Sequence, residues 1–223
     1  MSMKQSYNRY RITFTKTHTA RFIGHLDLQS LFQKAIKRAK LPVAYSEGFN
    51  PHQLLSFAVP LPLGMAGHAE ILEVFLTHET SPDVVAATLS AQLPQGISIV
   101  DVAEVPAIGK SAAALVRNAT YSIIFSQAIN FDEIIQSVLK SDKIEINRRG
   151  KKGMVTVDIR PDIFDLQAQA ASQHGLHTVL ACGSERNLKP EVLAQHILDL
   201  AGIAPENCDI TYERLKIGLK AVL

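Results

Sequence analysis

Tryptophan is absent from this chain of 223 residues, and cysteine occurs only twice, at Cys182 and Cys208. Two thiols cannot build the disulfide framework of a small secreted protein, so we expect a reduced, cytoplasmic protein. Residues 1–10 contain no apolar core of signal-peptide length, which favours the same compartment. Long apolar runs are missing too, because two prolines interrupt the most apolar stretch, 54–66. A membrane helix needs about 20 apolar residues, so we expect no membrane span.

Several signatures of enzymes and metal sites are also missing. The chain has no Gly-x-Ser-x-Gly nucleophile elbow, no phosphate-binding Walker loop and no glycine fingerprint for dinucleotides. It has no closely paired cysteines and no His-x3-His pair of the kind that holds zinc. His25, Asp27, His52, His68 and Glu70 are residue types that bind metals, but their spacing predicts no metal site. We therefore expect neither a metal nor a cofactor.

Charge of one sign is missing from a long internal stretch. Residues 53–109 contain six acidic side chains and no Lys or Arg, whereas residues 1–52 contain nine Lys or Arg and two acids. The remainder, 110–223, is nearly balanced, with 14 basic and 13 acidic side chains. Such a chain can attract a polyanion with one part and repel it with another. The alternative is that both charge blocks are solvated faces without a partner.

Hydrophobic periodicity predicts an α+β fold made of two similar units. In the first unit, 1–107, the expected strands are 10–15, 43–45, 54–58, 69–76 and 97–105, and the expected helices are 28–39 and 83–92. In the second unit, 119–223, the expected strands are 121–125, 143–148, 154–160, 176–181 and 208–215, and the expected helices are 131–140 and 190–200. Residues 108–118 form the expected linker, and 167–174 carry no clear pattern. We predict two tandem ferredoxin-like (split βαβ) units with antiparallel sheets, joined in one sheet or separate.

The segment 21–64 contains polar residues that neither helical nor strand periodicity explains. Asp27 is expected to be the N-cap of the first helix, where free backbone N–H groups also favour an anion. Asn50 and His52 flank Pro51 in a turn, and a residue before proline is extended, which directs both side chains. We predict that one concave site collects Arg21, His25, Asp27, Ser46, Asn50, His52 and Ser56. Phe49 is placed to stack on a base or ring.

This segment resembles the signature of the bacterial radical-SAM-linked family, a domain of unknown function. The matching pieces are RFIGHLDL (21–28), RAKLP (38–42), YSEGFNPH (45–52), SFA (56–58) and PLPLG (60–64). Members of that family occur fused to a cobalamin-binding radical SAM protein or are encoded beside one. The resemblance therefore implies a radical SAM protein as the partner. Two cysteines separated by 25 residues cannot replace the three closely spaced cysteines of a radical SAM core, so we expect a partner rather than that enzyme.

Two basic clusters favour binding to nucleic acid. One lies in the second half of the first helix and the other at a predicted hairpin tip, and together they comprise Lys34, Lys37, Arg38, Arg148, Arg149, Lys151 and Lys152. Because the chain lacks tryptophan and an RNA-recognition-motif signature, a structured RNA held by its backbone is favoured over stacked single strands. The alternatives are a favourable interaction with the helix dipole for the first cluster and a solvated turn for the second.

Our leading hypothesis is an accessory partner of a radical SAM enzyme that binds or presents RNA or a ribosome-related substrate. The expected substrate-binding residues are Arg21, Ser46, Phe49, Asn50, His52 and Ser56. One alternative is an RNA-modifying enzyme in which Asp27 or His25 acts at the reacting centre. Another is a purely structural interaction module that docks through the acidic stretch 53–109.

Overall fold

The computed structural model describes residues 7–150, 153–169 and 174–220. The chain divides into two compact units, which we call unit 1 (Met1–Val116 with Leu219–Leu223) and unit 2 (Arg117–Gly218). The described residues form five α-helices and a mostly antiparallel sheet structure, which confirms the predicted α+β class. In the described part of the chain, no helix is long and apolar enough to cross a membrane.

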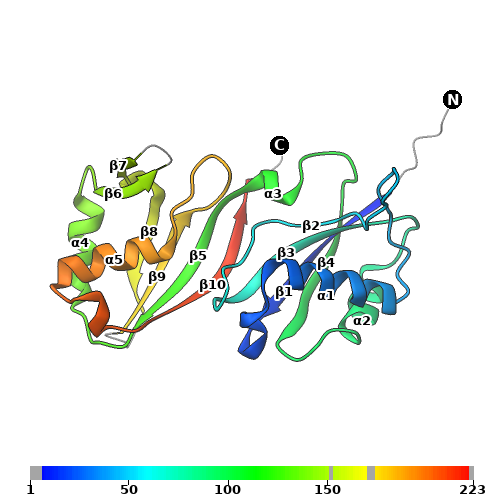
Figure 1. The fold of residues 1–223 in the computed structure, drawn as a ribbon, viewed down its shortest axis with the longest axis horizontal. Helices are drawn as coiled ribbons and strands as arrows, with labels where there is room; N and C mark the ends of the chain where they lie inside the picture. Colours follow the sequence, from blue (N-terminus) through cyan, green and yellow to red (C-terminus); the bar gives the residue numbers. More distant parts are fainter. Residues whose placement is uncertain (1–6, 151–152, 170–173, 221–223) are drawn as a thin grey trace. The chain divides into compact units, whose positions relative to one another are not determined.

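Unit 1 is an antiparallel sheet with two main helices (Figure 1). Its elements are β1 (Asn8–Lys16), the 3₁₀ helix η1 (His18–Phe22), α1 (His25–Arg38), β2 (Leu55–Phe57), β3 (Ala66–Leu76), α2 (Pro82–Ser90), β4 (Ile97–Val105) and α3 (Ala112–Leu115). The strand order is β4-β1-β3-β2, and each neighbouring pair is antiparallel. The central strands β1 and β3 therefore contribute side chains both to the core beneath the helices and to the opposite face of the sheet.

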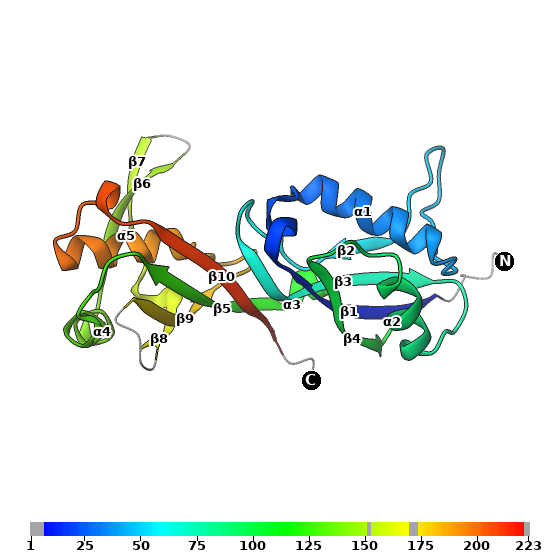
Figure 2. The same cartoon turned by 90° about the horizontal axis from the view of Figure 1, so that it is seen from below.

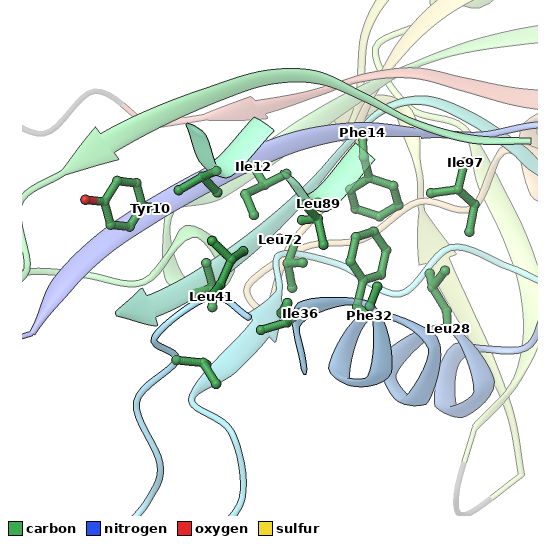
Figure 3. Close-up of a cluster of buried hydrophobic side chains, with 14 of the residues drawn as sticks. Tyr10, Ile12, Phe14, Leu28, Phe32, Ile36, Leu41, Leu72, Leu89 and Ile97 are labelled. Carbon is green, nitrogen blue, oxygen red and sulfur yellow. The ribbon is translucent and has the colours of Figure 1, made fainter. Parts of the chain in front are cut away.

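The core of unit 1 lies between its sheet and its helices. Tyr10, Ile12 and Phe14 alternate along β1 and are fully buried, as a strand with one covered face requires. Figure 3 shows Phe14 directed toward α1, from which Phe32 packs edge-on against it with ring centroids 4.9 Å apart. Phe57 from β2 completes the aromatic group, 5.9 Å from Phe14. Burial of each such side chain contributes roughly 1.5–3 kcal/mol, so this cluster fixes α1 on the sheet.

The opposite face of β1 and β3 contains a buried ionic cluster. Glu73 forms ion pairs with Arg9 and Arg11, and its carboxylate also accepts the Ala112 N–H at 2.9 Å. Arg9 donates a further bond to the Lys110 carbonyl at 3.0 Å. Burial alone would raise the pKa of Glu73, but the bonds from Arg9, Ala112 and Arg11 outweigh it and hold that pKa below its usual value. The segment that includes α3 is thereby fixed over this face.

Unit 2 has a similar sheet with an inserted hairpin. Its elements are β5 (Val116–Phe125), α4 (Phe131–Lys140), β6 (Glu145–Gly150), β7 (Gly153–Asp158), the 3₁₀ helix η2 (Arg160–Asp162), β8 (Ile163–Ala168), β9 (Gly175–Ala181), α5 (Pro190–Ala201), the 3₁₀ helix η3 (Pro205–Asn207) and β10 (Ile210–Leu219). The strand order is β10-β5-β9-β8. The strands β6 and β7 form a separate two-stranded pair, which stands away from this sheet beside α5 (Figure 2).

The observed elements differ from the predicted ones in a few places. The predicted strand at 43–45 consists only of isolated bridges at Val43 and Tyr45. The expected linker 108–118 contains α3 and the first residues of β5, which begins at Val116. The strand β8 was not predicted, and part of the unassigned segment 167–174 lies outside the described residues. The four long helices and the basic hairpin are confirmed.

Candidate functional site

Arg21 lies where the two ends of the segment 21–64, here called the motif segment, come together. Its guanidinium lies over the Phe22 ring, 4.7 Å from the ring centroid. The Arg21 carbonyl accepts a hydrogen bond from the buried Lys16 ammonium at 3.1 Å and another from the Gly64 N–H at 3.0 Å. These bonds connect η1 to the residues 60–64 at the other end of the segment 21–64.

His25 and Asp27 begin α1 in different environments. Gly24 is the N-cap residue and no side-chain cap bond forms, so the prediction that Asp27 is the N-cap is wrong. Asp27 is the third residue of the helix and is exposed, where its negative charge interacts favourably with the helix dipole. The His25 ring packs edge-on against Phe57 with centroids 5.5 Å apart. Asp27 thus stabilises the start of the helix, and His25 covers the aromatic core.

The second group of motif residues forms a closed loop. The Ser46 N–H donates to the His52 carbonyl at 2.8 Å, the His52 N–H donates to the Ser46 Oγ at 3.0 Å, and that Oγ lies 2.8 Å from His52 Nδ1. Gly48 adopts a φ of 120°, a conformation that favours glycine. Phe49 is exposed at 106%, the full exposure of a free side chain. Phe49 therefore lies at the exposed tip of a loop, residues 46–52, whose ends are joined by the hydrogen bonds between Ser46 and His52.

This loop is anchored on α1. Gln53 is buried, and its Nε2 donates to the Gln33 carbonyl of α1 at 3.2 Å and to the Tyr45 hydroxyl at 3.4 Å. Tyr45 and Gln53 also form a backbone bridge at the loop base. The loop, drawn in light blue, stands beside the C-terminal end of α1 in both ribbon views (Figures 1 and 2). The tip of the loop is therefore presented outside the core by a fixed base.

The seven residues predicted to form one concave site do not converge. Arg21, His25 and Asp27 lie at the start of α1, whereas the loop with Ser46, Asn50 and His52 is anchored at Gln33, eight residues and about 12 Å further along the helix. Ser56 pairs with Glu73, on the face of the sheet opposite Phe57 and the His25 ring. The prediction of a single site is therefore wrong, because α1 acts as a spacer within a segment that is continuous only in sequence.

The basic residues of α1 have unequal roles. Arg38 donates to the Gln92 carbonyl at 2.7 Å and to its side-chain oxygen at 3.3 Å, which connects α1 to the segment after α2. Lys34 and Lys37 are exposed on the solvent side of the helix. The position of Arg38 is thus explained by its bonds to Gln92. Lys34 and Lys37 are the residues of this cluster that remain available to a polyanion.

The register of the hairpin separates its basic residues. Arg148 pairs with Val155 and Arg149 pairs with Met154, so consecutive arginines point to opposite faces of the ribbon. Arg148 lines a cavity of about 580 Å³ that Arg186 and Lys189 also border. Arg149 projects from the other face and is exposed. Lys151 and Lys152, predicted to belong to the same cluster, lie outside the described residues.

The residues bordering this cavity were not predicted from the sequence, Arg148 excepted. Arg186 forms a bidentate ion pair with the buried Asp162 at the end of η2, and Lys189 is the residue that precedes α5. The one sequence signal that could have indicated this cavity is the presence of Arg186 and Lys189 shortly before Pro190, the first residue of a predicted helix. Among the described residues, no group of three or more His, Cys, Asp and Glu side chains is arranged to hold a metal ion.

A comparison with known families matches residues 9–190 to the family described as an uncharacterised protein conserved in bacteria, DUF2344. The match covers most of unit 1 and much of unit 2, including the motif segment, the hairpin and the start of α5. The chain belongs to this family. The match confirms the predicted membership of a bacterial family of unknown function. A comparison with curated proteins finds no match.

Proposed function

We propose that this member of the DUF2344 family is an accessory partner of a cobalamin-binding radical SAM enzyme and that it binds or presents RNA or a ribosome-related substrate. The observation that carries the proposal is the exposed Phe49 on its closed loop. Hydrogen bonds between Ser46 and His52 hold the loop in a shape that leaves the Phe49 side chain in solvent. An exposed aromatic side chain on a fixed loop is the arrangement expected of an anchor for another macromolecule. The partner itself comes from the family resemblance.

A second exposed apolar group supports a docking role for the same segment. Phe22, Leu26 and Leu63 are all exposed large hydrophobic residues, and all three belong to the motif pieces around the start of α1. The Phe22 ring lies 3.8 Å from the position that a Cβ on Gly64 would occupy, so the two pieces touch. A motif with its apolar side chains in solvent is typical of a binding surface rather than of a core.

The charges support the RNA component of the proposal. Lys34 and Lys37 are exposed on α1, and Arg148 and Arg149 are exposed on the hairpin. Exposed cations on a helix and on a β-ribbon are typical contacts to a phosphate backbone.

We also propose that both units are variants of one ferredoxin-like arrangement. Numbered within each unit, the four sheet strands follow the order 4-1-3-2 in unit 1 and in unit 2. The inserted hairpin and the extra 3₁₀ helix are what distinguish unit 2. A split βαβ unit supplies two helices and a four-stranded sheet without fixing any function, so the differences between the units mark where function resides.

Co-purification of the chain with the radical SAM partner that the family resemblance implies tests the docking role. We predict that Phe49→Ser weakens this association about tenfold or more, because burying a phenyl group contributes roughly 1.5–3 kcal/mol. Phe164→Ser is the matched control, since Phe164 is a partly exposed phenylalanine of unit 2. Equal association of all three proteins, or no association of the wild type, would refute the proposed docking role.

A further inference from the structure

An unexplained feature of unit 2 is a cavity between the hairpin and the start of α5. Its volume is about 580 Å³, within the range of small-ligand sites. Its apolar lining comes mainly from Ile146, Val157, Ile159, Leu188 and Val192. This volume accommodates one or two nucleotide units but not a duplex.

Three cations border this cavity, one from the hairpin and two from the segment between β9 and α5. Arg148 comes from β6, Arg186 from the segment after β9, and Lys189 from the residue before α5. Arg186 uses its Nε and Nη2 to hold Asp162, which fixes the guanidinium in place and neutralises that buried acid. The remaining acid of the lining is Glu185. The cavity thus combines an apolar floor with three cations, one of which is held by an ion pair.

A second cavity, which Arg148 also borders, has the opposite charge character. It measures about 490 Å³, and its lining includes Glu145, Glu191 and Asp199. Three carboxylates repel a phosphate, so a polyanion that contacts Arg148 is directed into the first cavity and away from the second. Arg148 therefore lies at the boundary between a basic and an acidic depression.

We infer that the basic cavity, bordered by Arg148, Arg186 and Lys189, binds the sugar–phosphate backbone of an unpaired RNA segment, with one sugar or base over the apolar floor. Phosphate oxygens accept bonds from Arg148 and Lys189, and the outer face of the hairpin is not part of the site. The choice of RNA as the polyanion rests on the proposed function, whereas the place of binding follows from the cavity alone.

The hairpin itself supplies a matched pair of variants. Arg148→Ala and Arg149→Ala remove the same charge from neighbouring positions of β6, but only Arg148 lines the cavity. Lys189→Ala is an independent variant from another segment. Arg186→Ala is unsuitable, because it would leave the buried Asp162 without its ion pair and would destabilise the fold.

The experiment measures binding of a fluorescently labelled 12-nucleotide unpaired RNA by anisotropy at several salt concentrations, with the full chain. We predict that Arg148→Ala and Lys189→Ala each weaken binding about five- to tenfold and flatten the log–log salt slope by about 0.7, the value for one lost phosphate contact on a single strand. Arg149→Ala should weaken binding less than twofold. Thermal melting of each variant verifies that it is folded.

Different failures have different consequences. Equal losses for Arg148→Ala and Arg149→Ala, or no loss for the two cavity variants, would overturn the cavity assignment while leaving RNA binding by the protein intact. If the wild type does not bind the RNA, the inference and the RNA component of the proposed function both fall. Loss of co-purification with the radical SAM protein in Arg148→Ala, without loss of RNA binding, would make the cavity a protein-docking surface and would also overturn the inference.

Discussion

At the scale of single residues, Glu73 shows how a buried charge is stabilised. Its carboxylate is almost inaccessible to solvent and accepts bonds from Arg9, Arg11 and the Ala112 N–H. The buried ion pair is weak evidence for net stability, but removal of one partner is expensive because the remaining charge stays buried. Arg9 is itself buried, so the cluster depends on the single negative charge of Glu73.

We predict that Glu73→Gln lowers the free energy of unfolding by roughly 3–5 kcal/mol, because two arginines then face each other without a counter-charge. Urea unfolding followed by circular dichroism measures the effect. Glu79→Gln is the control, since Glu79 is an exposed acid of the same unit and should change stability by less than about 0.5 kcal/mol. An equal effect of both substitutions would contradict this role for Glu73.

The same residue determines part of the pH dependence. The pKa of Glu73 is lower in the folded chain than the usual value of 4.5. Its contribution to stability is therefore complete above about pH 4.5 and is lost as the pH falls through the folded pKa. The stability difference between wild type and Glu73→Gln should accordingly shrink below pH 4.5, and a constant difference down to pH 2.5 would argue against an ionised Glu73.

At the scale of elements, regular periodicity was predictable and its interruptions were not. The spacing of Leu28, Phe32 and Ile36 predicted α1, and these residues are buried in the core. The strand β8 was missed because a bulge between Ile163 and Asp165 breaks the period of two, so that Ile163 and Leu166 are the buried residues. A single sequence has no local signal for such a bulge.

The candidate sites were only partly predictable for a similar reason. The sequence identified the loop with Phe49 and the basic residues of the hairpin, since both are local features. It placed the start of α1 and this loop in one site, because adjacency in sequence does not reveal that a straight helix separates them. The cavity of unit 2 was missed because Arg148 and Lys189 come from segments about 40 residues apart in the chain.

The closed loop makes separable predictions for its two polar residues. His52→Ala removes the contact with the Ser46 hydroxyl, so we expect a loss of about 1 kcal/mol, which lowers the melting temperature by about 2–4 °C. Asn50 is exposed beside Phe49, and Asn50→Ala should leave the melting temperature unchanged while weakening co-purification with the proposed radical SAM partner. A melting shift in Asn50→Ala as large as that in His52→Ala would assign Asn50 to the architecture of the loop.

At the scale of the whole molecule, the acidic stretch 53–109 is less of a surface than its composition indicates. Glu70 and Glu73 are buried, and the exposed acids of the stretch include Asp101 and Glu104 on β4. In the described sheet, β4 is the terminal strand of the order and pairs with β1. An edge strand exposes unpaired backbone groups, and charges along it prevent pairing with another copy. The acids of β4 therefore have a protective role that needs no partner.

The final prediction separates this protective role from docking through the acidic stretch. Asp101→Val with Glu104→Val should promote aggregation, because Val100 is already exposed beside them and the edge would become apolar. Asp101→Lys with Glu104→Lys should remain dispersed, because lysine protects an edge as well as an acid does. Light scattering of both double variants over a concentration series gives the comparison. If the lysine variant stays monodisperse but no longer co-purifies with the proposed radical SAM partner, the acids of β4 are docking residues, and the anchor proposed at Phe49 is at most one part of that interface.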